Sequence, residues 1–127
     1  MAVKLPDPMR RRDILYGSDT PPETLAEYGE AYEQLGQFDE ALQFYSQGRI
    51  MDGLKRMKAK AHELGNAFMM KVIAKSAPEL VGEDDWKNLI DAAARLGKEA
   101  YAAQARAALE GHLEALEPEE KRGQGKA

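Results

Sequence analysis

Residues 23–48 read ETLAEYGEAYEQLGQFDEALQFYSQG, and this stretch decides the fold. Its apolar residues recur at steps of three and four in each half: Leu25, Tyr28, Tyr32 and Leu35, then Phe38, Ala41, Leu42 and Tyr45. This spacing places each set on one face of an α-helix. Gly36 lies between the two sets, and glycine accepts the left-handed conformation that ends a helix. We therefore expect two amphipathic helices, over residues 21–35 and from residue 38 onward, that fold back on each other.

The same arrangement recurs twice further along the chain. Leu-Gly pairs occur at residues 35–36, 64–65 and 96–97, so the glycines are 29 and 32 residues apart. Before the later pairs, apolar residues keep the spacing of the first helix: Leu54, Met57, Ala61 and Leu64, then Trp86, Leu89, Ala93 and Leu96. We expect three helical hairpins. The second pairs residues 52–64 with 66–76, and the third ends with a long helix over residues 98–116. Phe44 lies off the shared face, and we expect it to contact the second hairpin.

The two ends of the chain differ from the repeats. Residues 1–22 contain four of the six prolines and the run Arg10-Arg11-Arg12. Proline removes helix hydrogen bonds, so residues 1–20 are expected to form an extended arm or a short helix, with Ile14 and Leu15 docking on the domain. Residues 21–116 form the helical domain. Residues 117–127 are charged and contain glycine, and we expect them to be disordered.

Composition argues against several classes of function. The chain has 127 residues, no cysteine and a formal charge of -4. A net negative charge gives no reason to expect nucleic acid or an anionic membrane as partner. No stretch approaches the roughly 18 apolar residues of a membrane span, and the proline-interrupted start does not resemble a signal peptide. We expect a cytoplasmic protein of one domain that binds neither nucleic acid nor membrane.

No set of residues suggests catalysis or metal binding. His62 and His112 are the only histidines, they fall in different hairpins, and no HxxxH or HExxH spacing occurs. The serines stand in loop or helix-end positions that capping explains, and no glycine-framed nucleophile turn or phosphate loop is present. We expect no enzymatic activity, no metal and no cofactor.

The first hairpin resembles the tetratricopeptide repeat (TPR) family. The family pattern of large residues, a small residue, a turn glycine and a later Ala between aromatics is matched by Leu25, Tyr28, Gly29, Tyr32, Gly36, Phe38, Ala41 and Tyr45. Trp86, Leu89, Gly97 and Ala102 keep it in the third hairpin, and Gly65 keeps it in the second. The resemblance implies an all-α fold of about six helices, stacked as antiparallel hairpins. It also implies a groove, lined by the first helix of each hairpin, that binds a peptide or helix of a partner protein.

By analogy with the family, the groove positions are Glu23, Ala26, Glu30, Glu33, Lys55, Ala59, His62, Lys87, Asp91 and Ala94. Glu27 joins Glu23 and Glu30 in an acidic stripe along one helix. Like charges at this spacing cost a few tenths of a kcal/mol per pair. The stripe is therefore either a solvated face or a landing site for a basic segment of a partner.

Two basic segments complete the candidate surfaces. Lys55, Arg56, Lys58 and Lys60 form a patch on the next helix, without the interleaved aromatic residues that stack nucleic-acid bases. Arg10-Arg11-Arg12 is expected to contact either the acidic helix of its own domain or a partner. The function expected is a non-enzymatic protein-protein interaction module or adaptor. The alternative is a structural subunit or scaffold that self-associates through exposed apolar faces at the ends of the array.

Overall fold

The structure is a computed structural model that describes residues 5–17 and 19–116. Within these ranges it contains helices and no strand, which confirms the all-α class. The elements are α1 (Pro8–Tyr16), α2 (Pro22–Gln34), α3 (Phe38–Gly48), α4 (Met51–Leu64), α5 (Ala67–Ser76), a 3-10 turn (Pro78–Leu80), α6 (Glu83–Arg95) and α7 (Glu99–Ala115). The tail expected to be disordered, residues 117–127, lies outside the described residues. None of the described helices has the length and apolar character needed to cross a lipid bilayer.

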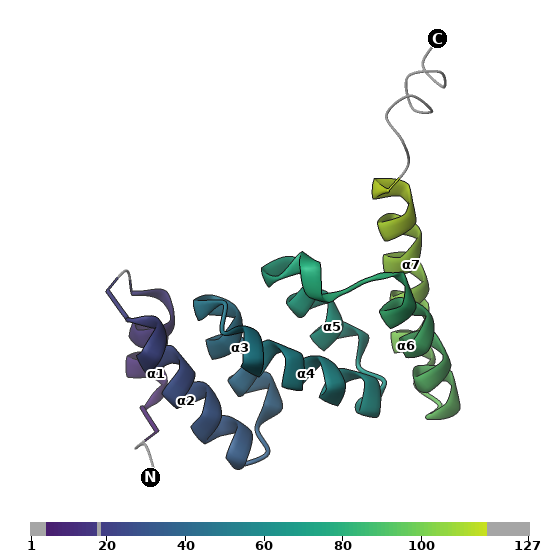
Figure 1. The fold of residues 1–127 in the computed structure, drawn as a ribbon. Coiled ribbons are helices and arrows are strands. Elements are labelled where there is room, and N and C mark those ends of the chain that lie inside the picture. Colours follow the sequence, from purple (N-terminus) through teal and green to yellow (C-terminus); the bar gives the residue numbers. More distant parts are fainter. Residues whose placement is uncertain (1–4, 18, 117–127) are drawn as a thin grey trace.

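The helices follow one another across the molecule from α1 at one end to α7 at the other (Figure 1). Three helix pairs are joined by short turns and pack along each other: α2 with α3, α4 with α5, and α6 with α7. In addition, α4 contacts both α2 and α6, while α5 contacts both α3 and α7. The first helix of each pair therefore neighbours the first helix of the next pair, and the same holds for the second helices.

Each turn contains a glycine in the left-handed conformation. The φ angles are +76° at Gly36, +61° at Gly65 and +73° at Gly97. In each case the residue after the glycine donates its N–H to a carbonyl five residues earlier, at distances of 3.0, 2.9 and 2.8 Å in chain order. These bonds satisfy carbonyls that the end of a helix leaves without partners. The role expected of the repeated Leu-Gly pairs in ending the helices is confirmed.

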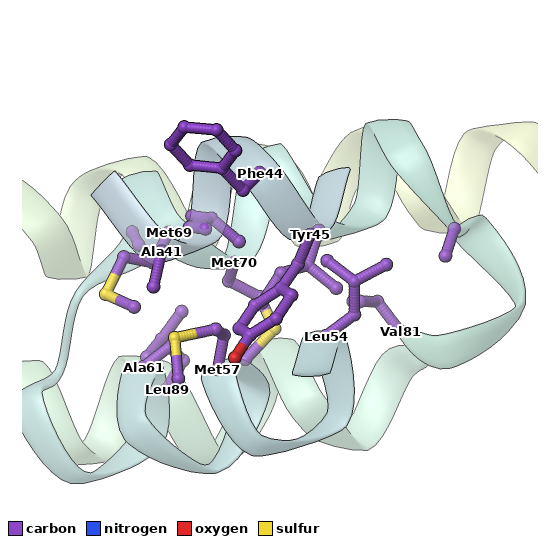
Figure 2. Close-up of a cluster of buried hydrophobic side chains, with 14 of the residues drawn as sticks. Ala41, Phe44, Tyr45, Leu54, Met57, Ala61, Met69, Met70, Val81 and Leu89 are labelled. Carbon is purple, nitrogen blue, oxygen red and sulfur yellow. The ribbon is translucent and has the colours of Figure 1, made fainter. Parts of the chain in front are cut away.

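The hydrophobic core runs through all three helix pairs (Figure 2). Its largest fully buried side chains come from α3, α4, α5 and α6: Tyr45, Phe44, Leu54, Met57, Met69, Met70, Ile73 and Leu89. Because α5 contacts helices of all three pairs, its residues at the centre of the molecule are buried on more than one side. The array therefore shares a single core, rather than one small core for each pair.

Phe44 is buried, and its aromatic contacts lie in the first pair, so its expected contact with the second hairpin stays a prediction. The Phe44 ring packs within the first pair, with its centroid 5.4 Å from that of Tyr32 and 5.6 Å from that of Tyr28. Its neighbour Tyr45 is the residue that reaches the second pair, where it meets Gly53. Adjacent residues on a helix differ in direction by about 100°, so Phe44 and Tyr45 face different neighbours.

The start of the chain forms a docked helix. Asp7 caps α1 by accepting a hydrogen bond from the Arg10 N–H at 2.9 Å. Leu15 is only 2% exposed, which confirms the docking expected for this segment. Arg11 forms an ion pair of 2.6 Å with Glu40 of α3 and donates to the Gln43 side chain at 3.0 Å. Within the arginine run, Arg11 therefore contacts the domain through α3, not through the acidic stripe of α2.

Candidate functional site

The predicted groove positions and the acidic stripe include eight residues other than alanine, which are the candidates for partner binding, and all eight lie on the first helices of the three pairs. They are Glu23, Glu27, Glu30 and Glu33 on α2, Lys55 and His62 on α4, and Lys87 and Asp91 on α6. Six of them are exposed, while Glu33 and His62 are half-buried. Lys87 forms an ion pair of 2.6 Å with Glu83 one turn earlier in its own helix. The structure places α2 beside α4 and α4 beside α6. Glu33 and His62, however, form hydrogen bonds with other residues of the fold.

Tyr45 forms the centre of the junction between the first and second pairs. Its ring lies between the backbones of two helical glycines: a β-carbon on Gly29 would be 2.5 Å from Tyr45 Cε1, and one on Gly53 would be 2.5 Å from Tyr45 Cδ1. Real β-carbons do not approach other atoms this closely, so a side chain at either position would force the Tyr45 ring to shift. The Tyr45 hydroxyl donates to Glu33 Oε1 at 2.6 Å.

Arg56 completes a polar triad with Glu33 and Tyr45. The Arg56 Nε lies 3.1 Å from Glu33 Oε2, and its Nη2 donates to the Tyr45 hydroxyl at 3.2 Å. Burial, followed by the hydrogen bond to Glu33, raises the pKa of Tyr45 above its ordinary value. The hydrogen bonds to Glu33 and then to Tyr45 raise the pKa of Arg56. Glu33 therefore joins α2, α3 and α4, and it is not an unpaired groove residue.

An open hollow of about 370 Å³ lies beside this triad. It is lined by Glu30, Glu33, Gln34 and Arg56, so it lies between α2 and α4. Glu30 is exposed and has no ion-pair partner in the described part of the chain. Glu23 and Glu27 continue the acidic stripe along the exposed side of α2. The hollow therefore combines an unpaired carboxylate with an arginine whose orientation the triad fixes.

The junction between the second and third pairs is held by Asp85. Its Oδ1 lies 3.0 Å from His62 Nε2 and 3.2 Å from Lys58 Nζ, and its Oδ2 accepts the Gly82 N–H at 2.9 Å. Burial by itself raises the pKa of Asp85, but the hydrogen bonds from Gly82, His62 and Lys58 outweigh it and hold this pKa below its ordinary value. His62 therefore attaches α4 to the start of α6, which explains why it is half-buried.

The basic patch predicted on α4 is divided among separate contacts. Arg56 bonds Glu33, Lys58 bonds Asp85 and the Leu80 carbonyl, and Lys60 bonds Glu63 at 2.9 Å while its ammonium lies 4.7 Å from the centre of the Phe38 ring. Only Lys55 of the four is exposed without a recorded partner within the described ranges. The patch is therefore not a continuous cationic surface.

Sequence reasoning missed the importance of Gly53 and of the triad. One signal was present, because glycine inside a helix costs about 1 kcal/mol relative to alanine and calls for a packing reason. Gly29 and Gly53 both lie inside amphipathic helices, and the Tyr45 ring is that reason.

The structure shows no group of three or more His, Asp or Glu side chains arranged to hold a metal ion, as far as the described residues extend. Comparison of the chain with protein-family models, with curated proteins and with solved structures gave no match.

Proposed function

We propose that the chain is a non-enzymatic protein-binding module, built as a short TPR-like array of antiparallel hairpins, that holds a basic segment of a partner protein between α2 and α4. The hollow lined by Glu30, Glu33, Gln34 and Arg56 is the observation that carries this proposal. Its volume of about 370 Å³ suits one or two side chains of a bound segment rather than a whole helix.

The groups that line the hollow favour a lysine or arginine side chain together with the backbone carbonyls of an extended peptide. A lysine or arginine of the partner would pair with Glu30, whose carboxylate has no partner in the described chain. Arg56 and Gln34 offer N–H groups that suit backbone carbonyls of an extended segment. Glu23 and Glu27 would attract further basic residues along α2. Because these carboxylates are exposed, binding is expected to weaken as salt is raised.

Peptide binding measured by isothermal titration calorimetry tests this proposal. The probes are a synthetic lysine- and arginine-rich peptide and an acidic peptide of the same length. The basic peptide is expected to bind the wild type, and Glu27→Lys combined with Glu30→Lys is expected to reduce its affinity at least tenfold. The control is Asp39→Lys combined with Glu99→Lys, which makes the same charge change at exposed positions of α3 and α7.

Both double variants are first checked for helical content by circular dichroism. Equal loss of affinity in the two variants would mean that overall charge, rather than the hollow, attracts the peptide. Unchanged affinity in the α2 variant, with its fold intact, would place recognition elsewhere on the molecule.

A further inference from the structure

The N-terminal end of the array presents an apolar helix face to solvent. Met9 is 81% exposed and Tyr16 is 67% exposed. They are seven residues apart on α1, so they lie on the same face, about 100° around the helix from the buried Leu15. The exposed side chains of Arg12 and Asp13 lie on the two flanks of this face. The face therefore has an apolar side chain at each end, with Arg12 on one flank and Asp13 on the other between them.

The C-terminal end presents a second apolar face, because α7 extends past its partner helix. The helix α6 has 13 residues and α7 has 17. The pKa of Glu83, the first residue of α6, is lowered chiefly by Lys87 and also by His112 of α7. Glu83 and His112 therefore lie near each other. Residues of α7 beyond His112 therefore project past the start of α6, as Figure 1 shows. Two of them, Leu113 and Leu116, are 42% and 63% exposed.

The charges beside this overhang are opposite to Arg12. Glu110 is exposed about one turn before Leu113, and it forms no ion pair within residues 5–17 and 19–116. The C-terminal end of α7 also carries the partial negative charge of its last carbonyl groups. A cation is therefore favoured at this end of the array.

We propose that the two ends bind each other in successive copies of the chain, so that the arrays associate head to tail. The outward face of α1 in one copy would pack on the α7 overhang of the next, with Met9 and Tyr16 against Leu113 and Leu116. Arg12 would then face Glu110. Contact between two α7 overhangs is disfavoured, because it would bring two Glu110 carboxylates together. Contact between two α1 faces would leave Leu113 and Leu116 exposed at the other end of each copy.

A head-to-tail contact leaves one free end of each kind, so it does not close into a dimer and grows by addition. A contact between single helix faces is smaller than the roughly 1,200 Å² typical of stable complexes, so the association is reversible and depends on protein concentration. This inference uses neither Glu30 nor the hollow between α2 and α4, and it stands apart from the proposed peptide binding.

Sedimentation velocity of the full chain over a wide range of concentrations tests the proposal. The wild type is expected to show a sedimentation coefficient that keeps rising with concentration. Arg12→Glu alone and Glu110→Lys alone are each expected to remain monomeric, because each places like charges at the contact. An equal mixture of the two variants is expected to assemble again, since every contact in an alternating chain then joins opposite charges.

Lys71→Glu and Glu99→Lys are the matched controls, because they reverse exposed charges on α5 and at the other end of α7. Both are expected to assemble like the wild type. The proposal is overturned by a wild type that stays monomeric, by single variants that assemble normally, or by a mixture that fails to recover. A species that stops at the dimer would show that like ends meet, which also overturns it.

Discussion

Replacing Gly53 by alanine would place a methyl group against the buried ring of Tyr45. The new β-carbon would lie 2.5 Å from Tyr45 Cδ1 and 2.6 Å from Cε1 and Cγ, well inside the usual carbon-carbon contact of about 3.5–4 Å. The ring has little room to retreat, because Gly29 closes its other side. Its hydroxyl is also held by Glu33 at 2.6 Å. The clash therefore falls on a side chain that is fixed at both faces and at its tip.

Two opposing effects set the size of the change in the free energy of unfolding. Forcing extra volume into a packed core costs about 1–3 kcal/mol. Alanine is better than glycine inside a helix by about 0.5–1 kcal/mol, and this gain partly offsets the clash. Since the ring is held on every side, we take the upper part of the first range. The expected result is a net destabilisation of about 1–2 kcal/mol.

Urea unfolding followed by circular dichroism measures this difference. The control is Gly111→Ala in α7, where a β-carbon would meet nothing within 4 Å. That substitution is expected to stabilise the protein by about 0.5–1 kcal/mol, so the two variants should differ from the wild type in opposite directions. A Gly53→Ala protein as stable as Gly111→Ala would refute the view that the Tyr45 ring occupies this space. In a Tyr45→Leu background, the penalty of Gly53→Ala is expected to shrink.

Three further predictions concern side chains that join the helices. Tyr45→Phe keeps the ring but removes the hydroxyl shared by Glu33 and Arg56, and it is expected to cost about 1 kcal/mol in urea unfolding. Asp85→Asn is expected to cost about 1–2 kcal/mol at neutral pH. Because the pKa of Asp85 in the folded protein lies below that of the unfolded chain, its carboxylate stabilises the fold above about pH 4, and this contribution is lost as the pH falls through the folded-state pKa. The difference between Asp85→Asn and the wild type should therefore shrink in acid, and a difference that is constant with pH would contradict the assignment. Leu15→Ala is expected to speed amide hydrogen exchange in α1 at least about tenfold, while the amides of α4 and α5 keep their protection; equal acceleration throughout would show that α1 does not open separately.

The helices and their turns could be predicted because their signals are local. Apolar residues at steps of three and four define one face of a helix, and a glycine that ends the pattern defines the turn. Gly36, Gly65 and Gly97 follow this rule, since each adopts a positive φ angle at the end of a helix. Each signal lies within a few residues of the structure that it specifies, so it does not depend on how the helices are arranged in space.

The partners of the charged residues could not be predicted in the same way. Arg56 and Lys58 lie two residues apart on α4, yet one bonds α2 and the other bonds the segment around α6. Which helix each side chain meets depends on the positions of α2 and α6 around α4, and a sequence pattern reports only the face within one helix. The same limit explains His62, which the family resemblance placed in an open groove and which bonds Asp85 in the structure.

The two junctions differ in a way that fixes the order of the helix pairs. Gly29 and Tyr45 stand seven residues before and nine residues after the first turn glycine, where the second pair has Lys58 and Ala74. A copy of the second pair placed first would supply neither the tyrosine ring that packs against Gly53 nor the glycine on the other side of that ring. The pairs are therefore not interchangeable parts, and duplicating one of them would not lengthen the array. Growth of this architecture by internal duplication would require a new junction, with its own packing residues, for each added pair.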